Sequence, residues 1–268
     1  MIPTISSTKL WSALRADERK RIISQSTDHL REFGAVIWSD FLPKGFDQNQ
    51  AQSILLDIVD YFGTPIEHDR NKKRVWDIRK TEEVSSIPTY SQHDGEAILH
   101  TDSQYRNRPE EAFALLCVRK AECGGGLSIA LHVDTIVEEL RKQPFGRKAE
   151  EILRNVVFSF AVPTIFNQQA GNEAEWIEAP ILVGKTIRYR QDTLRKGLKV
   201  ANRELSDEEQ KAIELLEAII ADKEVSEFFM LEPGDLLFCD NQRLLHGRTA
   251  FTDHRRHLLR TRFNWHSH

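Results

Sequence analysis

Two pairs of residues of the same form could bind a metal ion. His100 and Asp102 lie in the stretch "AILHTDSQYR", and His132 and Asp134 lie in "LSIALHVD". Residues i and i+2 of a β-strand point to the same side, so either pair can direct an imidazole and a carboxylate at one ion. A third ligand must come from elsewhere in the chain. His246, in "DLLFCDNQRLLHGRTAF", is the best candidate.

The chemistry of this donor set is specific, but each pair alone is weak evidence. Two imidazoles and one carboxylate on one face of an ion leave the opposite positions open, which suits Fe(II) that must bind a cosubstrate and O2. His and Asp side chains also pair as simple hydrogen-bonding neighbours. The chain has 10 histidines, so chance pairs are expected, and both interpretations stay open on these residues alone.

Composition narrows the class of protein. The chain has 268 residues, 40% of them hydrophobic and 29% charged, which is typical of a globular protein with a substantial core. A formal net charge of −4 argues against a general nucleic-acid surface. We see no signal peptide and no apolar run long enough to span a membrane. An odd count of 3 cysteines indicates a reducing compartment, so we expect a cytoplasmic protein.

Hydrophobic periodicity predicts a β-rich chain with several helices. The segment 64–99 reads as irregular and polar. We expect helices over 16–34, 48–63, 135–153 and 206–223, and strands over 35–42, 112–121, 127–133, 156–162, 181–190, 227–231, 235–240 and 257–265. Strands and helices do not alternate regularly. A two-sheet barrel such as a jelly roll therefore fits better than a doubly wound sheet.

Four motifs in order resemble a known family. "LHTD", "GGLS", "DNQRLLHGRTAF" and "RRHLLR" are similar to motifs of the Fe(II)/2-oxoglutarate-dependent dioxygenases of the taurine dioxygenase (TauD/TfdA) superfamily, and "DNQRLLHGR" is closest to its clavaminate synthase-like branch. The resemblance runs from about residue 90 to 264. It implies a β-rich α+β fold, in which a double-stranded β-helix (a cupin-like jelly roll) forms the core and helices flank it.

No internal repeat, low-complexity tract or Pro/Gly linker divides the chain, so we expect one dioxygenase domain over residues 1–268. Residues 1–63 would supply the N-terminal helices and first strand, and 64–99 a candidate active-site lid. Residues 100–264 would form the jelly-roll core, with a helical insert near 205–222.

The resemblance decides between the two pairs. In the family a Gly-Gly-x-Thr/Ser turn follows the first metal His, and here Ser128 in "GGLS" follows His100 but precedes His132. The implied metal ligands, which are also the catalytic centre, are therefore His100, Asp102 and His246.

The cosubstrate site follows from charge and from the family. The far carboxylate of 2-oxoglutarate needs a buried cationic fork, and Arg is the natural partner. "RRHLLRTR" reads as a strand with Arg256, Leu258, Arg260 and Arg262 on one face, although alone it also fits a solvated basic strand or a phosphate-binding patch. By resemblance, Arg256 with Ser128 would hold the far carboxylate. Arg260 would be the second arginine, reaching an acidic group of the cosubstrate or substrate.

The implied reaction is the hydroxylation of an unactivated C–H bond, with release of succinate and CO2. Asp102 argues against halogenation, because halogenating relatives lack this carboxylate. Desaturation or cyclisation, as in natural-product biosynthesis, is the alternative. A zinc hydrolase and a non-catalytic cupin-like protein are the rival interpretations; the zinc hydrolase has no use for a buried Arg and Ser pair.

The substrate is expected to be a small amino acid or an acidic molecule. Candidate contacts are Gln92, Glu96, Arg188, Arg190, Asp192 and Arg260. Residues 188, 190 and 192 would share a face if their segment is a strand. Glu96 or Asp192 would hold an ammonium group, and Arg260 or Arg188 a carboxylate. We expect no nucleic-acid or membrane partner, and the sequence does not indicate an oligomeric state.

Overall fold

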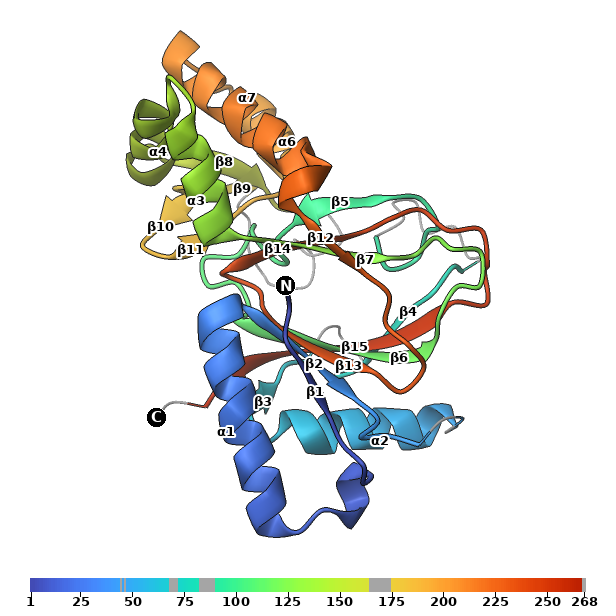
Figure 1. Ribbon diagram of the computed structural model, residues 1–268. Helices are drawn as coiled ribbons and strands as arrows, with labels where there is room; N and C mark the ends of the chain where they lie inside the picture. The colour runs from blue at the N-terminus through green and yellow to red at the C-terminus, as the bar shows by residue number, and fades with distance from the viewer. Residues whose placement is uncertain (44, 46, 68–71, 82–89, 164–174, 267–268) are drawn as a thin grey trace.

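The computed structural model describes residues 1–43, 45, 47–67, 72–81, 90–163 and 175–266. Two β-sheets stack face to face with helices on their outer sides (Figure 1). This arrangement confirms the predicted β-rich α+β fold with a two-sheet core. None of the helices in the described ranges combines the length and apolarity needed to cross a membrane.

The larger sheet carries the C-terminal strand through its middle. Its strands follow the order β1-β2-β13-β6-β15-β3, and β4 also pairs with β15. All its pairs are antiparallel except β1 with β2. The strands are β1 (Thr4–Ser6), β2 (Ala35–Ser39), β3 (Gly63–Pro65), β4 (Trp76–Ile78), β6 (Ala112–Arg119), β13 (Leu236–Asp240) and β15 (His257–Trp265).

The smaller sheet brings together strands from distant parts of the chain. Its order is β12-β7-β14-β5, from β5 (Ala97–His100), β7 (Ser128–His132), β12 (Glu227–Phe229) and β14 (Leu244–Arg248). Two separate two-stranded sheets complete the strands: β8 (Phe158–Ala161) pairs with β9 (Trp176–Ala179), and β10 (Leu182–Val183) with β11 (Thr186–Ile187).

The helices form two groups, one for each sheet. Against the larger sheet pack α1 (Ala16–Phe33) and α2 (Gln48–Val59), preceded by a 3-10 turn, η1 (Trp11–Ala13). Against the smaller sheet pack α3 (Val133–Lys142), α4 (Gly146–Asn155), α6 (Gln191–Val200) and α7 (Asp207–Ala221), followed by η2 (Lys223–Val225). Local signals explain the ends: Gly34 closes α1 with a φ of 73°, and Ser206 and Glu209 form a capping box on α7.

Successive side chains of β15 point alternately to the two faces of the larger sheet. Leu259 and Phe263 face α2 in an apolar cluster with Trp38 and Phe238. Leu258 packs in the apolar core between the two sheets, and Arg260 and Arg262 lie on its side of the strand. The predicted face of "RRHLLRTR" is therefore present for residues 258–262, whereas Arg256 precedes the strand.

Several predicted elements were wrong. The helix predicted over 135–153 is two helices, because Pro144 holds Gln143 in an extended conformation between α3 and α4. The strand predicted over 181–190 is the β10–β11 hairpin, which turns at Gly184 (φ 54°). The segment predicted as irregular over 64–99 contains β4, β5 and the end of β3, and α6 was not predicted at all. Whether 64–99 forms a lid stays a prediction, since 68–71 and 82–89 lie outside the described residues.

Gly197 lies where α6 packs closely on β8, so a substitution there tests this contact. A Cβ there would overlap the carbonyl oxygen of Ser159. Helix propensity alone makes Ala more stable than Gly in a helix. We predict that Gly197→Ala nevertheless destabilises the fold by about 1–3 kcal/mol, the range expected for overpacking. Chemical denaturation measures this change. The exposed neighbour Lys196→Ala should leave stability nearly unchanged, and a stabilised Gly197→Ala would contradict the packing described here.

Candidate active site

The two histidines of the predicted triad are cross-strand neighbours. His100 ends β5 and His246 lies in the middle of β14, and the antiparallel register pairs them directly. Their ring centroids are 4.4 Å apart, and the His246 ring also packs on Phe113 at 4.5 Å. The predicted strands end at residue 240 and resume at 257, but His246 lies within a strand. Its orientation is thus fixed by the ladder.

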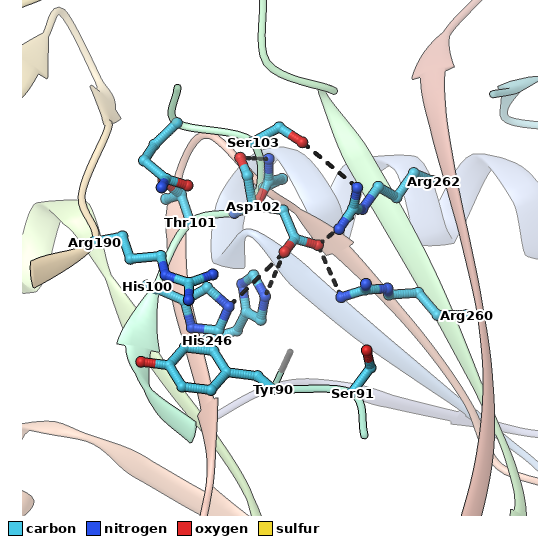
Figure 2. Close-up of polar contacts among 12 residues, drawn as sticks. Tyr90, Ser91, His100, Thr101, Asp102, Ser103, Arg190, His246, Arg260 and Arg262 are labelled. Carbon is cyan, nitrogen blue, oxygen red and sulfur yellow. Dashed lines mark hydrogen bonds and ion pairs between the residues drawn. The ribbon is translucent and has the colours of Figure 1, made fainter. Parts of the chain in front are cut away.

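Asp102 completes the cluster from the turn after β5. Its Oδ1 lies 3.8 Å from Nε2 of His100 and 4.0 Å from Nε2 of His246. Ligand atoms of the three side chains all lie within 4.8 Å of one another, so one ion can contact all three. Figure 2 shows the carboxylate directed between the two imidazoles. The structure therefore brings together the three residues predicted as metal ligands.

The turn that carries Asp102 is held by a buried amide. Asn241 accepts a hydrogen bond from the Asp102 backbone N–H at 2.7 Å and donates to the carbonyl oxygens of Asp102 (3.1 Å) and Glu110 (2.8 Å). Asn241 is 1% exposed. Sequence reasoning missed this role, although Asn241 stands in the "DNQRLLHGR" motif; the signal was a buried amide directly after a strand.

Two arginines of β15 hold the other oxygen of Asp102. Nη1 of Arg260 and Nε of Arg262 donate to Oδ2 at 3.0 Å and 3.1 Å. Oδ1 is then the oxygen that faces the histidines. Arg262 was not among the predicted site residues, because the sequence shows only that it shares a face with Arg260.

Burial and charge set the protonation states that metal binding requires. Burial would raise the pKa of Asp102, but Arg260 and Arg262 outweigh it and hold that pKa well below its usual value. Burial, followed by the charge of its neighbour His246, lowers the pKa of His100 well below its usual value. Burial also lowers the pKa of His246 to about 4. At neutral pH the site thus presents two neutral imidazoles and one carboxylate.

The hydrogen bonds of the two histidines are compatible with a metal ion bound between them and Asp102. Nδ1 of His100 contacts the Ile98 carbonyl oxygen at 2.7 Å, which leaves Nε2 as the ligand atom. Both ring nitrogens of His246 are buried and have no hydrogen-bond partner among the described residues. A buried polar atom without a partner is costly, and a metal ion would satisfy Nε2. A His-Asp-His set of this kind suits Fe(II) with open positions.

The second His-x-Asp pair has a structural role. His132 is the N-cap of α3, and its Nδ1 accepts a hydrogen bond from the Asp134 backbone N–H at 3.1 Å. In the described part of the chain, the only cluster of His, Cys, Asp or Glu arranged to hold a metal is His100, Asp102 and His246. The order of motifs in the sequence had favoured the same pair.

Arg256 is a buried cation that pairs with no acidic side chain of the described residues. It is 4% exposed and stacks on Phe251 at 5.2 Å, and its Nη1 has no hydrogen-bond partner in the described ranges. Burial lowers its pKa to about 10. A Cβ at Gly126 would lie 2.9 Å from its Nε, so glycine allows the turn before Ser128 to approach it. Ser128, which is buried, begins β7 opposite Arg248.

The predicted substrate contacts are only partly brought together. Arg188 donates to the carbonyl oxygens of Gln104 and Arg106 at 2.9 Å and 2.7 Å, so it stabilises a loop. Glu96 is exposed and lines a groove beside α7. Gln92 is partly buried, and its carbonyl oxygen accepts from the Thr81 N–H. Asp192 lies in the first turn of α6 and binds Arg190. Residues 188, 190 and 192 do not share a strand face, because the helix begins at 191.

Comparison with known proteins identifies the family. The model of the family described as "Taurine catabolism dioxygenase TauD, TfdA family" matches residues 7–262. The chain belongs to this family, which confirms the resemblance found in the motifs and the predicted dioxygenase class. No curated protein sequence matches the chain.

Solved structures with the same fold share low sequence identity with the chain. An asparagine oxygenase bound to Fe(II), 2S,3S-3-hydroxyasparagine and succinate has a TM-score of 0.71 at 20% identity, over 95% of this chain and 81% of that one. The non-heme iron oxygenase OrfP with Fe and α-ketoglutaric acid has 0.70 at 14%, over 100% and 95%. PvcB from Pseudomonas aeruginosa has 0.63 at 15%, over 98% and 86%. Two of the three hold iron with 2-oxoglutarate or its product succinate, which agrees with the cofactors predicted from the motifs.

Replacing Arg262, one of the two arginines that bind Asp102, tests its importance for the metal site. We predict that Arg262→Gln weakens Fe(II) binding about tenfold to a hundredfold, the usual effect of losing a group that orients a ligand. Anaerobic Fe(II) titration by calorimetry measures the change. Arg255→Gln is the matched control, since Arg255 is exposed and pairs with Asp253. Equal Fe(II) affinity in Arg262→Gln and wild type would show that Arg262 does not support the ligand set.

Proposed function

We propose that this protein is a non-heme Fe(II)- and 2-oxoglutarate-dependent oxygenase that hydroxylates a C–H bond of a small amino-acid-like substrate, with release of succinate and CO2. The observation that carries the proposal is the His100, Asp102 and His246 cluster, which combines close ligand atoms with the protonation states a divalent ion needs. The asparagine oxygenase and OrfP structures contain hydroxylated amino acids. They favour hydroxylation over desaturation or cyclisation.

Each residue has a defined part in this proposal. When bound, the iron supplies the activation of O2 and the oxidation of 2-oxoglutarate. His100, Asp102 and His246 are the residues that would hold it. Arg260 and Arg262 keep Asp102 ionised and direct one oxygen at the histidines. The apolar ring of Phe113 covers the side of His246 and limits access of water there.

Arg256 is the residue we assign to the far carboxylate of 2-oxoglutarate, with Ser128 beside it. Both arginines have a buried donor atom without a partner in the part of the chain described. Arg260 already forms an ion pair with Asp102, however, whereas Arg256 forms no ion pair with a described residue. A buried guanidinium near no carboxylate is stabilised by an anionic ligand, and a carboxylate accepts two parallel bonds from it. Arg260 keeps the role of second arginine, next to the metal.

We assign the protein to the cytoplasm on its cysteine content. All three cysteines are unpaired, and Cys117 and Cys239 are buried. A reducing compartment keeps such thiols in this form. The expected partner is the small-molecule substrate.

The central test is anaerobic reconstitution with Fe(II) and 2-oxoglutarate, followed by addition of O2 and a panel of amino acids and small acids. We expect succinate formation that depends on iron and rises with one class of substrate. His246→Ala should abolish it by removing one ligand. Succinate formation that persists in His246→Ala would move the third ligand elsewhere. Bound zinc together with no succinate formation would favour a hydrolase.

The cosubstrate assignment has its own test. We predict that Arg256→Ala weakens 2-oxoglutarate binding by at least about tenfold, the effect of losing a hydrogen bond between charged groups. Anaerobic calorimetry on the iron-loaded protein measures the dissociation constant. The adjacent exposed residue gives the control Arg255→Ala, which should bind 2-oxoglutarate as the wild type does. Near-normal affinity in Arg256→Ala would disprove its assignment.

A further inference from the structure

Arg190 is a rigidly held cation at the edge of the metal site. It precedes α6 as its N-cap residue, and its guanidinium stacks on the ring of Tyr90 at 4.3 Å. Its Nε and Nη2 donate to the two carboxylate oxygens of Asp192 at 2.7 Å and 2.9 Å. Ring and carboxylate together fix the plane of the guanidinium. Little conformational entropy remains to be lost when an anion binds to it.

The guanidinium of Arg190 faces the predicted metal ligands. Figure 2 shows its side chain extending over His100 toward Asp102. The Tyr90 ring beneath it also packs on the ring of His100, with 4.9 Å between centroids. Arg190 is among the charges that act on His100, Asp102 and His246. Tyr90 and Arg190 therefore form one stacked layer against the metal site.

One edge of the Arg190 guanidinium remains available. Asp192 occupies the edge formed by Nε and Nη2, and Nη1 donates to no partner among the described residues. The side chain is 25% exposed, so a solute can reach it. Arg188, two residues earlier, differs because backbone carbonyl groups use its donors. The carboxylate of Asp192 already accepts hydrogen bonds from Arg190 and from the Thr193 N–H. It is therefore a poor partner for an ammonium group of the substrate.

We propose that Arg190, stacked on Tyr90, binds a carboxylate of the substrate, so that the substrate class is an amino-acid-like molecule with an acidic group at this point. The proposal rests on the proposed function and deepens it. Arg190 would determine which substrate binds, because it contacts the substrate directly. Its hydrogen bonds go to Asp192 and not to the metal ligands, so replacing it leaves their hydrogen bonds in place.

The experiment compares carboxylate and amide forms of one ligand. Aspartate, its side-chain amide asparagine and its main-chain amide isoasparagine are titrated anaerobically into the protein loaded with Fe(II) and 2-oxoglutarate, and the glutamate series is titrated in parallel. Wild type should bind one carboxylate form at least about tenfold more tightly than the matching amide. Arg190→Gln should remove that preference, and Arg190→Lys should restore only part of it, because Lys lacks the planar fork.

The control variant is Arg195→Gln, which lies on the same helix and pairs with Glu217 at an exposed position. It should keep the full preference. The proposal is overturned if no acid binds more tightly than its amide, or if Arg190→Gln leaves the preference unchanged. Affinity for Fe(II) and for 2-oxoglutarate is measured on every variant. If wild type binds neither Fe(II) nor 2-oxoglutarate, the proposed function is refuted instead. If cosubstrate affinity is normal and Arg190→Gln keeps the preference for the carboxylate, only the role of Arg190 is refuted.

Discussion

The candidate site depends on the pairing of one carboxylate with two guanidinium groups. Asp102 is buried, and burial alone would favour its neutral form. Arg260 and Arg262, on alternate positions of β15, reverse that preference and also select which oxygen faces the histidines. The larger sheet thus supplies the charge that keeps a ligand of the smaller sheet ionised. Neither sheet carries a complete site by itself.

The two sheets contribute differently to the geometry. The ladder between β5 and β14 fixes the histidines to each other, because His100 and His246 are direct partners. Asp102 lies outside that ladder, and Asn241 ties its backbone to the end of β13. Arg256 lies on the loop before β15, against Phe251 and Gly126. Backbone pairing therefore fixes the two histidines, whereas a side-chain amide and two arginines of β15 hold Asp102.

The sequence predicted the ligand set and the two-sheet core because both leave local signals. His-x-Asp on a strand, a distant His in a characteristic motif and alternating apolar residues can all be recognised without coordinates. The sequence could not predict that Arg262 reaches Asp102 or that Tyr90 stacks on Arg190, because residues far apart in the chain meet there only through the sheet register. The failure at 181–190 has a local cause: β-branched and aromatic residues favoured one strand, but the turn at Gly184 divides the segment into two short strands.

The helices that lie in sequence between Asp102 and His246 affect how the protein can change during evolution. Between β7 and β12 the chain leaves the sandwich, forms α3, α4, α6 and α7 and returns, and this excursion carries Arg190. The strands β5 and β14, which pair His100 with His246, are hydrogen-bonded directly to each other. Thr101, between two of the metal ligands, also exchanges hydrogen bonds with Tyr189 of the excursion. A change of the Arg190 side chain can therefore alter what is recognised and leave the pairing of the histidines intact, whereas a change that displaces Tyr189 would also move the turn that carries Asp102.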